Sequence, residues 1–148
     1  MLEIYERLDS EHSIPIDDYL ELSHEQRDRS RLRVISRSGR EVRLFLERGT
    51  PLQVGELLRS SCGQHLRVEG APEEVVTARC SDWSGFSRAC YHLGNRHVKM
   101  QMGERWLRIL PDHVLEALLE RLGFTLMREQ CIFIPESGAY GSSHHHPH

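Results

Sequence analysis

Lysine is nearly absent from this chain of 148 residues, because Lys99 is the only lysine and arginine supplies the rest of the 19 basic residues. The formal net charge at pH 7 is only −3, so the overall charge gives no reason to expect a nucleic acid or an anionic membrane as partner. Seven of the 18 arginines crowd into residues 27–43. That stretch indicates either a patch for an anionic or protein ligand, or simply solvated strand and turn positions.

The chain also lacks the short motifs of several enzyme classes. It has no glycine-rich phosphate loop and no HExxH or GxSxG element. No apolar run approaches membrane-spanning length, and residues 1–8 carry charges instead of the apolar core of an export signal. The cysteines form no CxxC pair, and their scatter is typical of buried thiols in a reducing compartment: Cys62, Cys80, Cys90 and Cys131. We therefore expect a cytoplasmic protein that is not an enzyme.

Residues 1–72 predict a small β-rich domain. Apolar and polar residues alternate over Val42–Leu46 and again near Leu66–Val68, and turn residues separate such segments. Ser23 and Gln26 have the spacing of a capping box around a single helical turn. Several short strands at close spacing suggest a small β-sandwich or an open barrel.

Residues 73–141 predict a different architecture, a ferredoxin-like α+β domain. Gly70–Glu74 combines flexible, rigid and charged residues, which is typical of a domain boundary. The elements expected after it follow the order βαββαβ. They are a strand at 75–78, a helix capped by Ser81 and ended by Gly94, strands at 97–102 and 106–109, a helix from near Pro111 to Gly123, and strand-like segments at 124–127 and 131–134. Residues 142–148 are expected to form a flexible tail.

Histidine is abundant, with ten residues in the chain. Four of them lie among the last five residues: His144, His145, His146 and His148. Neutral imidazole suits nickel, copper and zinc, so the cluster predicts a metal-binding tail. The preceding Gly-Ser-Ser also resembles the linker of a purification tag, but Pro147 interrupts the run, which favours a native tail.

The other histidines are isolated in the sequence. His92 and His97 flank a predicted junction of helix and strand, where each is either a ligand or a polar residue of a turn. His113 lies in the first turn of the second predicted helix. The remaining three have no neighbouring ligand and are expected at the surface: His12, His24 and His65.

One segment is specific enough to indicate a family. Tyr91–His97 reads YHLGNRH, and together with Leu107–Leu115 and Pro135–Gly141 it is similar to the urease accessory protein E family, the nickel metallochaperones of urease maturation. Residues 27–33 and 39–50 resemble the N-terminal domain of that family. The resemblance therefore extends over nearly the whole chain.

The resemblance implies a function and an assembly. It implies an N-terminal peptide-binding-like domain, a metal-binding domain, and a homodimer that forms higher oligomers with metal. Nickel would lie on the two-fold axis with His97 as axial ligand and the four tail histidines as further ligands, while zinc and copper compete in vitro. His92 and His113 are auxiliary candidates. The implied partners are the urease apoprotein and other urease accessory proteins, including the GTPase.

The chain departs from the family pattern at three places. Its tail is short, Pro111 stands two residues before His113, and Ser137 replaces a more usual glycine. Two other classes of function stay open on the residues alone. One is a peptide- or nucleic-acid-binding module that uses the arginine-rich stretch, and the other is a metal-dependent hydrolase.

Overall fold

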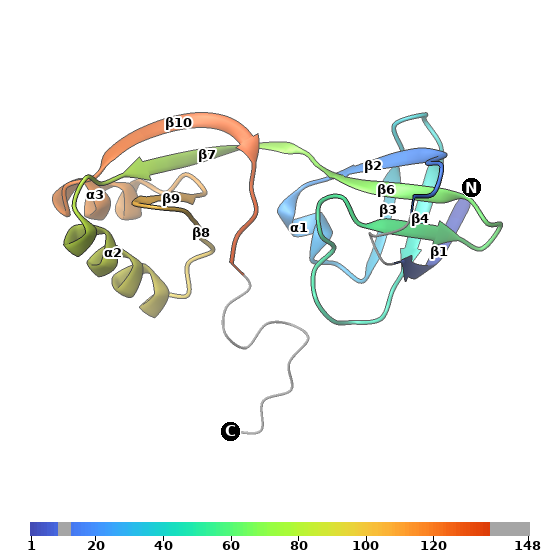
Figure 1. Cartoon of the computed structure of the whole chain (residues 1–148), viewed down its shortest axis with the longest axis horizontal. Coiled ribbons are helices and arrows are strands. Elements are labelled where there is room, and N and C mark those ends of the chain that lie inside the picture. The colour runs from blue at the N-terminus through green and yellow to red at the C-terminus, as the bar shows by residue number, and fades with distance from the viewer. Residues whose placement is uncertain (9–12, 137–148) are drawn as a thin grey trace, which may run out of the picture. The chain divides into compact units, whose positions relative to one another are not determined.

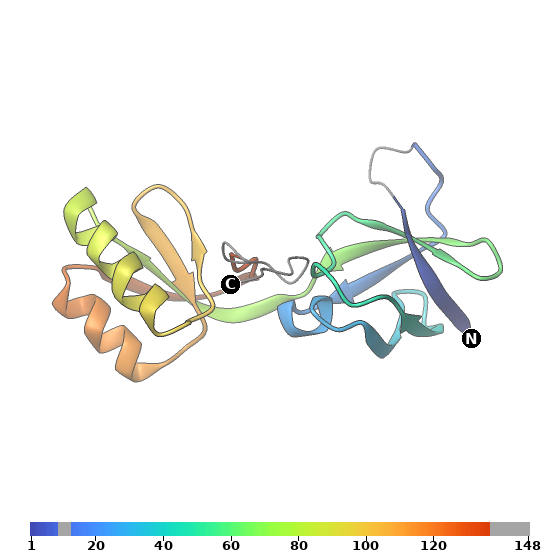
Figure 2. The same ribbon diagram turned by 90° about the horizontal axis from the view of Figure 1, so that it is seen from below.

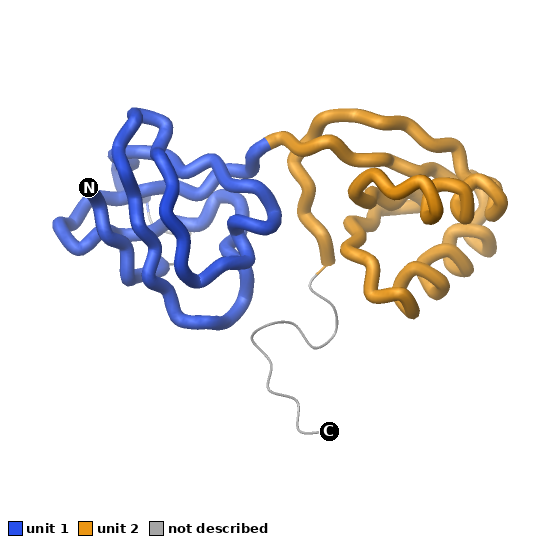
Figure 3. The backbone as a smooth tube through the Cα atoms, turned by 180° about the vertical axis from the view of Figure 1, so that it is seen from behind, with its two compact units in different colours: residues 1–71, 137–148 blue, residues 72–136 orange. Residues whose placement is uncertain are grey.

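The protein, seen in a computed structural model, is described over residues 1–8 and 13–136 (Figure 1). It divides into two compact units, Met1–Ala71 and Pro72–Glu136, coloured separately in Figure 3. In the described part of the chain, every helix is too short or too polar to cross a membrane.

The first unit is one six-stranded sheet that curves into a nearly closed barrel, with the strand order β2-β6-β5-β1-β4-β3. The pairs β1/β4 and β2/β6 are parallel and the other three pairs are antiparallel. The mixed β and α+β class is thus confirmed, and the open barrel is the correct alternative for this unit. Its elements are β1 (Leu2–Leu8), β2 (Asp18–Leu22), α1 (His24–Arg27), β3 (Arg31–Ile35), β4 (Glu41–Phe45), β5 (Leu57–Ser60) and β6 (His65–Gly70).

Alternation along the strands fills the barrel with aliphatic side chains. Val42 and Leu44 of β4 are almost fully buried, as their spacing predicts, and so are Leu66 and Val68 of β6. The capping box of α1 is also confirmed. Ser23 Oγ accepts from the Gln26 backbone N–H at 3.2 Å, while the Gln26 side chain accepts from the Ser23 N–H at 2.9 Å.

The barrel is closed at one point by a buried carboxylate. The Arg37 N–H, just beyond β3, donates to Tyr19 O of β2 at 2.9 Å. Asp18, only 3% exposed, accepts from Ser36 Oγ at 2.6 Å and from the hydroxyl and N–H of Ser38. Burial alone would raise the pKa of Asp18, but the hydrogen bonds from Ser36, Ser38 and Tyr19 N–H outweigh it and lower the pKa to about 2. Asp18 therefore fastens β2 to the β3–β4 turn as a carboxylate, and this junction between Asp18, Ser36 and Ser38 is called the barrel seam below.

The second unit is a ferredoxin-like layer with the strand order β10-β7-β9-β8, antiparallel throughout. Both helices cover the same face of the sheet (Figures 1 and 2). The core between the layers contains Val76, Leu107 and Leu119. The predicted order βαββαβ is the one observed. The elements are β7 (Pro72–Arg79), α2 (Trp83–Asn95), β8 (Gln101–Met102), β9 (Trp106–Ile109), α3 (His113–Arg121) and β10 (Thr125–Ile132).

Several predicted boundaries are wrong. Asp82, not Ser81, caps α2, because its carboxylate accepts from the Gly85 N–H at 2.9 Å and its negative charge suits the helix N-terminus. The helix also continues through Gly94 to Asn95, and β8 is reduced to two residues. The two expected closing segments form the single strand β10, which pairs with β7 along all of its length.

Two expectations about single residues also change. His24 is buried at 6% exposure rather than lying at the surface, because α1 packs against β2. Cys62 is exposed in the turn between β5 and β6, whereas Cys80 is buried as expected. Cys90 and Cys131 are partly buried, and all four thiols are free.

Candidate metal site

His97 occupies the position that ends helix α2. Its N–H donates to Gly94 O at 3.1 Å, and the Val98 N–H donates to Leu93 O at 3.3 Å. This pair of hydrogen bonds is a Schellman motif, whose first residue beyond the cap takes a left-handed conformation. His97 accordingly has φ 55. Leu93 is fully buried and Val98 packs against the same core, so the backbone of His97 is fixed while its side chain stays exposed.

The conformation of His97 is unfavourable for a residue with a β-carbon. Glycine usually fills this position of the motif, and other residues at positive φ are uncommon, although histidine tolerates it better than most. Such backbone strain, on the order of 1–3 kcal/mol, clusters at functional sites. The stretch Gly94–His97 therefore puts the imidazole at a place where stability alone would favour glycine.

The auxiliary candidates, His92 and His113, are exposed and come from different helices. His92 lies in the last turn of α2. Its ring contacts the ring of Tyr91 edge-on, with the two ring centroids 5.5 Å apart. His113 is the first residue of α3. Nowhere in residues 1–8 or 13–136 do three or more His, Cys, Asp or Glu side chains gather into a group that could hold a metal ion. The described part of one chain thus offers exposed imidazoles at His92, His97 and His113, but no group of three ligands around any of them.

Of the remaining histidines, the two that the structure describes, His24 and His65, do not complete such a group. His24 is buried in the first unit, and His65 Nδ1 lies 4.0 Å from Asp17 Oδ2. The other histidines lie outside the described residues, namely His12 and the four of the tail: His144, His145, His146 and His148.

Sequence reasoning missed a pair of sulfur atoms near the same helix. Cys90 Sγ, on α2, donates to Met102 Sδ of β8 at 3.5 Å. Burial raises the pKa of the Cys90 thiol. Because a thiol must ionise to act as a nucleophile or a strong ligand, Cys90 is a packing residue at neutral pH. Nothing in the sequence spacing links positions 90 and 102.

Comparisons with known proteins cover both units. Residues 3–71 match the family model of the UreE urease accessory protein, N-terminal domain, and residues 73–148 match the C-terminal domain. A urease accessory protein UreE of Marinomonas sp. is 56% identical over 146 residues, which is 99% of each chain. One from Alteromonas mediterranea is 48% identical over 98% of this chain and 94% of its own. One from Psychromonas ingrahamii is 46% identical over 100% of this chain and 97% of its own.

Both halves, matched in chain order, define an accessory protein of urease maturation. The chain belongs to the UreE urease accessory protein family. Membership points to a non-enzymatic, metal-related role beside the urease machinery.

Proposed function

We propose that this chain is a nickel metallochaperone that binds Ni(II) and delivers it to the urease apoprotein during assembly of the active site. The observation that carries the proposal is His97, an exposed imidazole held in left-handed backbone geometry at the end of α2. Nickel is the cargo here, not a resident cofactor.

One imidazole cannot hold an ion by itself, so the proposed site takes further ligands from a second chain and from the tail. In a homodimer, a two-fold axis near His97 would duplicate it into a facing pair. Two nitrogen ligands leave several coordination positions of nickel open to water or to the tail histidines, His144, His145, His146 and His148. That incomplete shell suits delivery, because a closed cage would release its ion slowly.

The partners and the metal follow from the same proposal. The chain would act in the cytoplasm with the urease apoprotein and the other accessory proteins, the GTPase among them. By the Irving–Williams order, copper competes strongly for an imidazole site, and zinc is a further competitor. Nickel is selected by the role in urease maturation rather than by the ligands themselves. His92 and His113 remain auxiliary candidates for a second ion.

The test is a nickel titration of the full chain combined with mass measurement. We expect about one tightly bound ion per two chains, lost in His97→Ala while the folded dimer persists. His65→Ala, which removes a histidine of the first unit, is the matched control and should bind nickel like the parent chain. Unchanged tight binding in His97→Ala would overturn the assignment of the site.

A second variant separates the tail from the axial ligand. A chain truncated before Ser142 should bind fewer ions or bind them more weakly, with the melting temperature of the metal-free protein unchanged. The reason is that residues 142–148 contain no apolar side chain able to join a core. A full complement of tightly bound nickel in the truncated chain would remove the tail from the proposal.

A further inference from the structure

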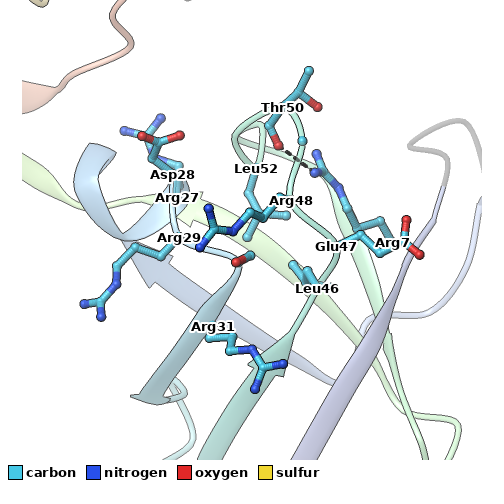
Figure 4. Close-up of a pocket in the computed structure, with 12 residues that line it drawn as sticks. Arg7, Arg27, Asp28, Arg29, Arg31, Leu46, Glu47, Arg48, Thr50 and Leu52 are labelled. Atoms are coloured by element: carbon cyan, nitrogen blue, oxygen red, sulfur yellow. Dashed lines mark hydrogen bonds between the residues drawn. The ribbon is translucent and has the colours of Figure 1, made fainter. Parts of the chain in front are cut away.

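The arginine-rich stretch forms a pocket in the first unit, far along the sequence from His97. The pocket, about 490 Å³ in volume, lies between the segment that follows α1 and the loop that follows β4 (Figure 4). That volume is in the range of small-molecule sites and exceeds what one inorganic anion needs. Leu46 and Leu52, both buried, contribute an apolar part of its lining.

Positive charge dominates the lining. Five arginines line the pocket against two acidic residues, Asp28 and Glu47. Within the described chain, three of the arginines have side chains without an ion pair or hydrogen bond: Arg29, Arg31 and Arg48. All three are exposed, so their long side chains can turn toward a ligand. Unpaired like charges held close together raise the local concentration of anions.

The walls of the pocket are fixed before any ligand arrives. The Leu46 N–H donates to Ser30 O at 2.8 Å, and the Leu52 N–H donates to Arg27 O at 2.7 Å, so two hydrogen bonds join the two segments. Arg7 holds the loop from the other side, through Thr50 O at 2.7 Å (dashed in Figure 4).

Arg7 is itself held in place by an acidic residue. Its guanidinium makes a two-pronged ion pair with Glu56, at 2.5 and 2.8 Å, and Glu56 is only 9% exposed. The Arg7 charge is therefore neutralised and Arg7 holds the loop, which leaves Arg29, Arg31 and Arg48 of the lining for a ligand. The backbone walls are therefore set before binding, whereas the exposed side chains of Arg29, Arg31 and Arg48 lose rotamer freedom when they turn toward the ligand.

The number and kind of donors select the chemistry of the ligand. A guanidinium offers a planar fork that matches two oxygens of a carboxylate or a phosphate. A carboxylate has two oxygens and one charge, which a single arginine satisfies. A phosphate group has more oxygens and up to two charges, so it can use several arginines at once. The apolar part of the lining then has room for an organic group.

We propose that this pocket binds a small phosphate-bearing molecule, with Arg29, Arg31 and Arg48 holding the phosphate and the organic part lying against Leu46 and Leu52. This site is independent of the proposed nickel site, since it lies in the other unit and uses no histidine.

The test is calorimetric titration of the metal-free full chain with phenyl phosphate, inorganic phosphate and benzoate, at pH 8 and fixed ionic strength. The pH is held well above the ordinary pKa of imidazole, near 6.5, to limit anion binding by histidine side chains. We expect phenyl phosphate to bind, and benzoate, which has the same ring on a carboxylate, to bind at least about tenfold more weakly. Inorganic phosphate tests the source of the phosphate. Weaker binding of inorganic phosphate than of phenyl phosphate supports an ester whose organic part lies against Leu46 and Leu52. Equal binding would support the arginine site for phosphate but overturn the role of the two leucines.

Two matched variants locate the binding. The triple variant Arg29→Gln, Arg31→Gln and Arg48→Gln should weaken phenyl phosphate binding by at least about tenfold, with its circular dichroism unchanged. The control variant removes the same charge from exposed arginines of the second unit and should bind like the parent: Arg79→Gln, Arg88→Gln and Arg121→Gln. Equal losses in the two variants, equal binding of benzoate, or no binding of any phosphate at 10 mM would overturn the proposal. Nickel binding should be the same in all three chains, so the two proposals fail separately.

Discussion

At the scale of single residues, His97 combines a conformational cost with a chemical role. Replacing it by glycine, the residue that favours positive φ, should raise the free energy of unfolding of the metal-free protein by about 1 kcal/mol. The same change should abolish the tight nickel site. His92→Gly is the control, because the same substitution inside α2 should lower stability by a few tenths of a kcal/mol. Urea unfolding at a fixed chain concentration measures the stability of both variants. A loss of stability in His97→Gly would contradict the inference that the backbone of His97 is strained.

Asp18 makes a prediction about acid. Its pKa in the folded state, about 2, is below the ordinary value near 3.9, so its contribution to stability is complete above about pH 5 and is lost as the pH falls toward 2. Asp18→Asn should lower stability at pH 7 by about 1–3 kcal/mol and reduce the further loss between pH 5 and 3. Asp28→Asn, at an exposed site of the same unit, is the control and should change the free energy of unfolding by less than about 0.5 kcal/mol. Denaturant unfolding at pH 7 and 3 measures the free energy of unfolding of each variant. If Asp18→Asn and Asp28→Asn gave the same values, the barrel seam would contribute nothing to stability.

At the scale of elements, the start of α3 depends on one cap. The Asp112 carboxylate accepts from the N–H groups of Val114 and Leu115 at 3.0 and 3.1 Å, and the Glu116 side chain accepts from the Asp112 N–H. Asp112→Ala should therefore cost about 1 kcal/mol of stability. Glu120→Ala, near the opposite end of α3, is the control and should be neutral or slightly stabilising, because a negative charge there opposes the helix dipole. Thermal unfolding measures the melting temperature of both variants. Equal changes in melting temperature would mean that the Asp112 cap does not stabilise α3.

The elements also show what the sequence could predict. Strand β4 followed from strict alternation, and the end of α3 followed from Gly123, which has φ 93. Strand β8 was predicted too long because the Schellman motif uses residues 96–98, and a turn of that kind leaves no signal when histidine replaces the usual glycine.

The same limit applies to the candidate sites. Residue patterns marked His97 only as a neighbour of a helix end, and its proposed role came from resemblance to a family. The arginine pocket depends on residues 27–31 and 46–52 lying together, and the seam at Asp18 depends on partners 18 and 20 positions away. Periodicity contains no information about such distant pairs.

At the scale of the whole molecule, the nickel proposal predicts acid release. Imidazole has an ordinary pKa near 6.5 and must be neutral to bind metal, so protons compete with nickel for each ligand. With at least two histidines per ion, apparent affinity should fall by more than about tenfold per pH unit below about pH 6. We expect retention at pH 7.5 and release near pH 5, with the fold intact because the carboxylate at the barrel seam is still ionised there. Nickel isotherms at several pH values, followed with circular dichroism, test this, and affinity that stays flat would exclude a histidine site.

The pairing of β7 with β10 also governs when the protein can fold during synthesis. Strand β7 is made early, yet its partner along all eight residues, Thr125–Ile132, is among the last parts of the described chain to leave the ribosome. The last strand of the barrel, β6, ends at Gly70. A nascent chain released at about two thirds of its length would therefore carry a finished first unit and an unpaired β7, whose open edge is a site for aggregation. Completion of the second unit, and with it the surroundings of His97, consequently waits until Ile132 has been synthesised.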